Sequence, residues 1–382
     1  MFNKILIANR GEIAARVIRT LRKMQIASVA VYSEPDRYSA PVLAADESLC
    51  IGPAAARESY LKVDAIIDAC LRSGAQAVHP GYGFLSENAG FAAQLAAHGI
   101  RFIGPRPEHL REFGLKHTAR ALAQASGVPL LPGSALLDDL DHALREAERI
   151  GYPLMLKSTA GGGGIGMHLC RSGAELRERF DAVQRMATAS FGDARVYLER
   201  FVETARHVEV QIFGDGQGRV VSLGERDCSL QRRNQKVVEE TPAPGLSEVL
   251  RQRLHAAART LGEAVRYESA GTVEFIYDVA CEAFYFLEVN TRLQVEHPVT
   301  ECVYGVDLVE WMIKQAAGEL ELPAQENLQP RGAAVEVRLY AENPQREFQP
   351  SAGLLTEVRF ADDIRVDGWI ETGTEVSAYY DP

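Results

Sequence analysis

The N-terminal part of the sequence alternates short apolar runs with segments whose apolar residues recur at helical spacing. The apolar run 3–9 precedes a segment over 11–21 in which apolar side chains repeat on one helical face, and the strand-like run 28–32 follows. Further helical patterns lead into the strand-like runs 77–79 and 100–103. Strands that alternate with helices in this way predict an α/β domain, in which helices cover both faces of a parallel sheet.

The middle of the chain follows a different pattern, in which strand-like runs recur in close succession. A helix over about 107–126 is followed by Pro129 and Pro132, which indicate a boundary before a smaller lobe over about 133–203. Two of the later runs alternate apolar and polar residues, as in an antiparallel sheet with one exposed face. We therefore expect an α+β region with strands at 153–157, 196–201, 207–213, 219–224, 271–277 and 284–289.

The length of the chain indicates more than one domain. Its 382 residues exceed the roughly 250–300 at which a single hydrophobic core stops growing, so two or three domains are expected. The segments 333–340 and 353–382 read as short strands and turns, and the sequence stops there without a terminating helix. We therefore expect that the last lobe is truncated.

Charge and cysteine usage narrow the classes of partner. The chain has 41 Lys and Arg against 52 Asp and Glu, a net charge of −11, which argues against a nucleic-acid or anionic membrane surface. The six cysteines lack a CxxC spacing, which favours free thiols in a reducing compartment. The N-terminus has no signal-like apolar run. A cytoplasmic enzyme or binding protein is expected.

A glycine-rich segment follows the strand 153–157. Glycines occupy every position of 161–166 except Ile165, so backbone N–H groups can approach a polyphosphate without a Cβ in the way. Lys157, at the end of a strand expected to be buried, favours an anion nearby because a buried cation is costly when unpaired. A turn without a ligand is the alternative, since glycine patterns alone have many false positives.

Acidic residues interrupt two apolar strands. Glu274 lies in one strand, and Glu288 and Asn290 end the next. Two carboxylates and an amide oxygen suit Mg²⁺ that bridges nucleotide phosphates. The alternative is a pair of edge-strand acids that face solvent, which the apolar neighbours on both sides disfavour.

Two polar segments suggest anion chemistry. Arg292 and Gln294 can hold a small planar anion through forked donors, with Glu296 as a base two residues on. The segment 225–236 has four cations, which can attract phosphates or bicarbonate on an acidic background. A solvated strand and a surface loop of paired charges are the respective alternatives.

At this level of detail the chain resembles the biotin carboxylases over essentially its whole length. The matching motifs lie at 7–14, 79–88, 161–166, 231–236 and 288–300. The resemblance implies an ATP-grasp fold, with a Rossmann-like domain over 1–113 and an ATP-grasp domain over 114–325 that includes the lid at about 133–203. It implies an incomplete C-terminal biotin carboxylase domain over 331–382.

The resemblance also implies a role for each candidate residue. ATP would lie among the glycine loop and the polar residues of the ATP-grasp domain, namely Lys116, Lys157, Gly161, Gly162, Gly163, Gly164, Gly166, Glu199, His207 and Gln231. Magnesium or manganese would be held by Glu274, Glu288 and Asn290. Bicarbonate would be surrounded by Lys236, Arg292, Gln294, Val295 and Glu296. The biotin ureido ring would face Tyr82 and Arg338, and the catalytic set would be Glu296, Arg338, Lys236 and Arg292.

The activity that the resemblance implies is ATP-dependent carboxylation of biotin by bicarbonate through carboxyphosphate. Asn234 stands where acyl-CoA-type biotin carboxylases usually have His, and Ile165 where they have a basic residue. The stretches 113–120, 157–160 and 239–242 are more similar to the urea carboxylase branch. An acyl-CoA carboxylase subunit, another ATP-grasp ligase and a non-catalytic nucleotide-binding assembly module remain alternatives.

The implied partners follow from a missing motif. The sequence has no Met-Lys-Met biotinylation site, so biotin would be presented by a separate carrier domain. A carboxyltransferase domain would then use the carboxylated biotin, either in trans or in a removed C-terminal extension. Self-association as a homodimer is a further expectation of the resemblance.

Overall fold

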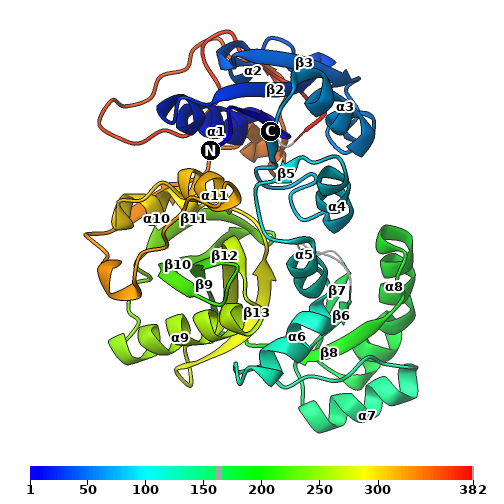
Figure 1. Ribbon diagram of the computed structural model, residues 1–382. Coiled ribbons are helices and arrows are strands. Elements are labelled where there is room, and N and C mark those ends of the chain that lie inside the picture. The colour runs from blue at the N-terminus through cyan, green and yellow to red at the C-terminus, as the bar shows by residue number, and fades with distance from the viewer. Residues whose placement is uncertain (160–165, 381–382) are drawn as a thin grey trace.

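The computed structural model describes residues 1–159 and 166–380 and begins with a five-stranded sheet. Its strands are β1 (Lys4–Ile7), β2 (Ala27–Ser33), β3 (Glu47–Gly52), β4 (Ala77–His79) and β5 (Arg101–Phe102). They are all parallel, in the order β3-β2-β1-β4-β5 (Figure 1). The predicted parallel sheet is confirmed, although β3 was not predicted.

Helices cover both faces of this sheet, because successive side chains of β1 point to opposite sides. Ile5 and Ile7 pack against α1 (Gly11–Lys23), whereas Leu6 lies in the other core with α3 (Val63–Ser73) and α4 (Ala89–Ala97). The two apolar cores therefore lie on opposite faces of the sheet, as in a doubly wound α/β domain.

The helix predicted over 107–126 is two helices. They are α5 (Pro107–Gly114) and α6 (Lys116–Ala125), and Leu115 between them is extended, with φ −110° and ψ 118°. Gly114 precedes the break, and glycine is the weakest helix former after proline. The break turns the chain and places Lys116 at the start of α6.

The lobe predicted at 133–203 is a small α+β unit. It consists of α7 (Leu140–Ile150), β6 (Leu154–Ser158), β7 (Met167–Cys170), α8 (Gly173–Phe191) and β8 (Val196–Arg200), with an antiparallel sheet in the order β7-β6-β8. Leu154, Leu156 and Leu198 pack with Leu176 and Phe180 of α8 in a separate core. Of the glycine loop, Gly161–Gly164 and Ile165 lie outside the described residues.

The central sheet is antiparallel and carries most of the candidate residues. Its strands are β9 (Ala205–Asp215), β10 (Val220–Arg232), β11 (Gln235–Thr241), β12 (Glu268–Asp278), β13 (Ala283–Asn290) and β14 (Ala334–Val337), in the order β13-β12-β9-β10-β11-β14. The expectation of a more exposed face is wrong for β9, whose residues 208–214 are buried without interruption, whereas β13 alternates half-buried and buried residues over 283–287. α9 (Glu248–Ala264) packs against this sheet, while α11 (Leu308–Ala316) packs between it and the N-terminal sheet (Figure 1).

The segment 225–236 is a β-hairpin. β10 continues to Arg232, and Arg233 and Asn234 form a two-residue turn with φ values of 52° and 65°. Such turns require positive φ at both positions, which asparagine tolerates better than most residues. Asn234 therefore suits the turn. The alternative of a surface loop of paired charges is wrong for the buried residues 225–228, but residues 233–235 are exposed and Arg233 is paired with Glu347.

The C-terminal segment returns to the N-terminal domain (orange to red in Figure 1). After β14 it contains the short pairs β15 (Glu342–Asn343) with β16 (Gln349–Pro350) and β17 (Gly353–Leu354) with β18 (Glu375–Val376). The Arg10 guanidinium lies 5.2 Å from the ring centroid of Trp369 and 4.3 Å from that of Tyr380. None of the described helices has the length and apolar character needed to span a bilayer.

Candidate functional site

Lys236, on β11, is the centre of the candidate site. Its Nζ donates to Glu209 Oε2 at 2.6 Å, Glu274 Oε1 at 2.9 Å and Glu296 Oε1 at 2.7 Å. Burial favours the neutral amine, but the three carboxylates prevail and raise the pKa of Lys236 well above its usual value. A single ammonium group thus holds together side chains from two neighbouring strands and from the loop that precedes α10 (His297–Tyr304).

Glu296 lies between two cations. It is the residue before α10 and is fully buried, and its second oxygen, Oε2, accepts a hydrogen bond of 2.9 Å from Arg338 Nη2. Arg338 follows β14, whose pairing with β11 brings it beside Lys236. The structure therefore brings Lys236, Glu296 and Arg338 together, although they are distant in sequence.

Arg292 organises the loop between β13 and α10. Its guanidinium donates to Asn290 Oδ1 at 2.9 Å and to Gln294 Oε1 at 2.7 Å. Its Nε donates to Glu87 Oε2 at 3.0 Å, so a residue of the N-terminal domain anchors it. Half-buried Val295 follows Gln294 in this loop. The Arg292 guanidinium thus provides the forked donors that the sequence indicated, and in this structure they donate to Asn290 and Gln294.

The three predicted metal ligands are adjacent in the central sheet. Glu274 of β12 is opposite Glu288 of β13, and Asn290 Nδ2 donates to Glu274 Oε1 at 2.8 Å. Burial and the charge of Glu274 raise the pKa of Glu288, whose nearest described cation pairing is Lys116 Nζ at 3.7 Å. A divalent cation would relieve this repulsion, and two carboxylates with an amide oxygen are ligands that Mg²⁺ or Mn²⁺ accepts. The residues present fit such an ion.

His207 of β9 lies on the other side of Glu274. Its Nε2 is 2.9 Å from Glu274 Oε2, and its Nδ1 accepts a hydrogen bond of 2.9 Å from Gln231 Nε2. Burial lowers the pKa of His207, but the carboxylate of Glu274 more than compensates and raises it.

The lobe over 133–203 contributes a second ion-pair group. Lys157 of β6 pairs with Glu199 of β8, which also pairs with Arg120 of α6. Lys157 and Glu199 are both buried, as the sequence argument for Lys157 required. Gly166, with φ 77°, accepts a backbone hydrogen bond from Ser158 where the glycine loop rejoins β7. Arg120 was not predicted.

Tyr82 approaches the site from the N-terminal domain. Its hydroxyl donates to Glu12 at the start of α1. Burial raises the pKa of Tyr82 strongly, and the charge of Glu12 adds to it. Arg338 and Glu336 also contribute to that electrostatic environment. Tyr82 and Arg338 therefore face a common region, from the N-terminal domain and from β14.

The prediction that four cations of 225–236 serve the site is wrong for three of them. Arg226 is fully buried and donates to Glu209 at 2.6 Å, which makes it part of the sheet interior. Arg232 pairs with Glu342, and Arg233 lies 3.5 Å from Glu347 at the surface. The hairpin disperses these cations, because Arg226 and Arg232 belong to β10, Arg233 to the turn and Lys236 to β11.

Several site residues were missed in the sequence. Glu209 had a usable signal, because His207, Glu209 and Gln211 alternate with valines on β9 and must share a face. Glu87, Glu239 and Glu336 had no such signal, because their contacts come from other domains or from the pairing of β11 with β14. The spacing of residues along the sequence does not predict contacts of this kind.

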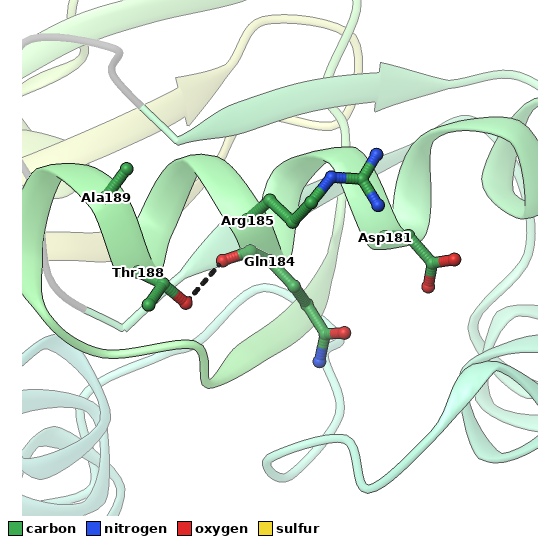
Figure 2. A pocket seen from close by; sticks show the side chains of 5 residues that line it. All are labelled: Asp181, Gln184, Arg185, Thr188 and Ala189. Atoms are coloured by element: carbon green, nitrogen blue, oxygen red, sulfur yellow. Dashed lines mark hydrogen bonds between the residues drawn. The ribbon is translucent and has the colours of Figure 1, made fainter.

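A separate open hollow of about 440 Å³ follows one side of α8 (Figure 2). It is lined by Asp181, Gln184, Arg185, Thr188 and Ala189, and the Thr188 hydroxyl donates to the backbone oxygen of Gln184 at 2.9 Å. These residues come from one helix, and none of the candidate site residues lines the hollow.

Family models match almost the entire chain. Residues 1–110 match the biotin carboxylase N-terminal domain, residues 116–324 match the ATP-binding domain of the carbamoyl-phosphate synthase L chain, and residues 336–382 match the biotin carboxylase C-terminal domain. The three matches follow one another in the order of the three structural regions described above.

Individual proteins match over the same length. Urea amidolyase of Lachancea kluyveri is 55% identical over 381 residues, which is 100% of this chain and 21% of that protein. The mitochondrial methylcrotonoyl-CoA carboxylase subunit alpha of Mus musculus is 51% identical, over 99% of this chain and 53% of that protein. The chain thus spans about a fifth and about half of the length of these relatives.

A solved structure has the same fold. The biotin carboxylase domain dimer of Hydrogenobacter thermophilus 2-oxoglutarate carboxylase, in complex with MgADP, ADP and bicarbonate, superposes with a TM-score of 0.95. It is 43% identical, and the match covers 100% of this chain and 84% of that chain.

Proposed function

The chain belongs to the biotin carboxylase family of ATP-dependent ligases, and from this premise we propose that it carboxylates biotin with bicarbonate and ATP. The observation that supports this most directly is Glu296 held between Lys236 and Arg338, at 2.7 and 2.9 Å. An acid between two cations can exchange one of its contacts for a small anion, which both cations then stabilise.

Bicarbonate is the first substrate in this proposal. It takes up donors from Lys236 and Arg292, and Glu296 accepts its proton. The resulting carbonate oxygen attacks the γ-phosphorus of ATP, so that a P–O bond forms as the bond to ADP breaks and carboxyphosphate results. Lys157 and Lys116 contribute positive charge around the phosphates. A magnesium ion held by Glu274, Glu288 and Asn290 would neutralise charge on the phosphate oxygens.

Biotin is the second substrate. Carboxyphosphate breaks down to CO₂ and phosphate, and the phosphate takes the proton from N1 of the biotin ureido group. The nitrogen then attacks CO₂, while Arg338 stabilises the negative charge on the ureido oxygen. Tyr82, fixed by Glu12, bounds this region from the N-terminal domain. Biotin would be carried by a separate domain, because this sequence contains no Met-Lys-Met site.

The final acceptor in the complete protein is proposed to be urea or a guanidine-type compound. Identity to a urea amidolyase, at 55%, exceeds that to a methylcrotonoyl-CoA carboxylase subunit, at 51%, and Asn234 departs from the usual acyl-CoA-type motif. Because the margin is small, acyl-CoA carboxylation is the second candidate. The complete protein, incubated with each acceptor in turn, would decide between them by acceptor-dependent phosphate release.

The test of the main proposal is phosphate release by this chain with Mg-ATP and bicarbonate, with and without free biotin. Release stimulated by biotin is expected. ATP binding by calorimetry without any release would instead support a non-catalytic nucleotide-binding module. Phosphate release that is the same with and without biotin would favour another ATP-grasp ligase. Sedimentation of the same sample tests the homodimer that the Hydrogenobacter thermophilus structure suggests.

A further inference from the structure

Two glutamates face each other beside Arg338. Glu239 of β11 is directly opposite Glu336 of β14 in the antiparallel register, so their side chains share one face of the sheet. Glu239 is fully buried, and its Oε1 lies 2.5 Å from Arg338 Nη2. Like charges directly opposite each other destabilise a sheet. This pairing therefore requires an explanation.

One oxygen of each carboxyl group lacks a hydrogen-bond partner among the described residues. Glu239 Oε2 and Glu336 Oε2 are buried, and neither accepts a hydrogen bond from any residue in the described part of the chain. An ionised carboxylate in such a place would normally collect several donors. This geometry instead suits a pair in which one of the two carboxyls is protonated, so that Glu239 and Glu336 together carry fewer than two negative charges.

The surrounding charges make two negative charges still less favourable. Lys236 on β11 is already bound to three other carboxylates, and Arg338 is shared with Glu296. Four further titratable groups interact with the pair, namely Glu12, Tyr82, Glu209 and Tyr340. Glu12 accepts from Tyr82, and Glu209 accepts from Arg226. Helix α10, which packs against β11 and β14, carries Glu301, and this carboxylate is bound to Arg16 and Arg365. Free cations are therefore scarce around the pair.

We propose that Glu239 and Glu336 together carry one proton at neutral pH, so that Glu239 acts as a positioning residue for Arg338 and the positive charge of Arg338 remains available to the biotin ureido oxygen. This rests on the proposed function. Burial raises the pKa of Glu239 to about 7 and, together with the charge of Glu239, that of Glu336 to about 9. The shared proton therefore belongs mainly to Glu336 at neutral pH.

The shared proton matters because of the charge that Arg338 must stabilise. With Glu336 neutral, Arg338 faces two carboxylates, those of Glu239 and Glu296. If Glu336 also ionised, a third negative charge would lie where the ureido anion develops, and stabilisation of that anion would weaken. Loss of the proton should thus reduce the biotin-dependent rate while the ATP site, on the other side of Lys236, is spared.

The experiment measures biotin-stimulated phosphate release, with the release in the absence of biotin subtracted, as a function of pH. For the wild-type chain the stimulated rate is expected to fall above a pH of about 9. Glu336→Gln replaces the protonated carboxyl by a neutral amide, so its stimulated rate should lose this alkaline decline. Glu239→Gln should raise the KM for biotin about tenfold, with the KM for ATP changed less than about twofold.

A matched control comes from the same strand. Glu240→Gln changes the next residue of β11, which points to the opposite face, and it should leave the alkaline decline in place. An alkaline decline that persists in Glu336→Gln, or a KM for biotin unchanged in Glu239→Gln, would overturn the inference. A wild-type chain without any response to biotin would overturn the proposed function, and with it the role of the pair toward biotin.

Carbon-13 NMR of labelled glutamate carboxyls provides a readout that does not depend on activity. One carboxyl that remains protonated at a pH of about 8 is expected, and it should disappear in Glu336→Gln. If that variant fails to fold, the same resonance in Glu239→Gln should shift its titration toward lower pH, because the neighbouring charge is gone. Two glutamates that both titrate below a pH of about 6 would contradict the shared proton.

Discussion

Two buried clusters of charge in this molecule differ in how completely they are paired. The first, the Arg16 cluster, joins the N-terminal domain to α10, α11 and the C-terminal segment and comprises Arg16, Thr20, Glu301, Asp307 and Arg365. The second, the site cluster, lies on the central sheet and comprises Glu209, Lys236, Glu239, Glu274, Glu296, Glu336 and Arg338. Both bury ionisable groups, but only the second has more acids than bases.

The acids of the Arg16 cluster are fully matched. Glu301 accepts from Arg16 at 2.8 Å, from Arg365 at 2.8 Å and from the backbone of Leu308 at 2.7 Å. Asp307 accepts from Arg16 at 2.9 Å and from Thr20 at 2.8 Å. Burial opposes the charge on Asp307, yet Arg16 prevails and lowers its pKa. This arrangement stabilises a domain contact.

The site cluster has seven ionisable groups, of which two are cations. Burial, reinforced by the surplus of carboxyls, raises the pKa values of Glu239 and Glu336, whereas the pKa of Asp307 is lowered. The charges of the Arg16 cluster are neutralised within the fold, as in a structural ion-pair network. The unbalanced charges of the site cluster are typical of a site where a ligand supplies the missing charge. The predictions below test this contrast.

The largest effect is expected for Glu296→Gln. It removes the proposed base while it keeps the shape of the side chain, so bicarbonate-dependent phosphate release should fall by about 1,000-fold. Glu301→Gln makes the same chemical change in the Arg16 cluster and should retain turnover within about tenfold at low temperature. Steady-state phosphate release measures both variants. If phosphate release fell equally in the two variants, the two clusters would not differ in function as proposed.

For the free energy of unfolding, we expect the larger effect in the Arg16 cluster and the smaller one in the site cluster. Glu301→Gln leaves Arg16 buried without a full counter-charge and should lower the free energy of unfolding by about 3 kcal/mol. Glu336→Gln replaces a carboxyl that is already neutral and should change it by less than about 1 kcal/mol. Midpoints of urea unfolding monitored by fluorescence report both values. A larger loss in Glu336→Gln would mean that its carboxyl is a paired anion.

Metal binding should depend on Glu288, which lies opposite Glu274 of the site cluster, and not on the Arg16 cluster. Glu288→Gln removes one proposed ligand, so the Mg²⁺ concentration needed for half-maximal ATP turnover should rise about 10- to 100-fold. The control is Glu282→Gln in the exposed turn between β12 and β13, which should behave as the wild type does. Calorimetry of Mg-ATP binding gives the same comparison without turnover. Unchanged Mg²⁺ dependence would remove Glu288 from the metal site.

The smallest effect is on the pH dependence of stability, where the two clusters should act in opposite directions. Asp307, with its lowered pKa, stabilises the fold at neutral pH and loses that contribution as the pH falls through its folded-state value. Glu336 binds its proton more tightly in the folded chain, so its contribution decreases as the pH rises from about 4.3 toward about 9. Unfolding midpoints of Glu336→Gln should therefore decline less between neutral and alkaline pH. An unchanged slope would place the pKa of Glu336 in its ordinary range.

Local sequence patterns predicted the parts of the fold that depend on one strand or helix at a time. The alternation of runs such as 3–9 and 28–32 predicted the parallel sheet, because a buried strand carries its own apolar signal. The break at Leu115 and the burial of both faces of β9 were not predicted, since both depend on neighbours from elsewhere in the chain.

In the candidate site, too, the residues marked by a local sequence pattern were predicted, and those that depend on distant contacts were not. Glu274, Glu288 and Asn290 were found from polar residues within apolar strands, and the structure makes them neighbours. Family resemblance was needed for Arg338, which no local pattern selects. Glu239 and Glu336 were missed because their significance appears only when β14 pairs with β11, almost a hundred residues away in sequence.

That pairing of β14 with β11 also has a consequence for synthesis on the ribosome. Most of the sheet, from β9 to β13, can pair as soon as residue 290 has emerged, but Arg338 and Glu336 reach Glu296 and Glu239 only after a further strand has been made. Since domains fold in order from the N-terminus, a nascent chain holds its acidic cluster without its second cation for that interval. The charge balance of the site is therefore completed only after the rest of the central sheet.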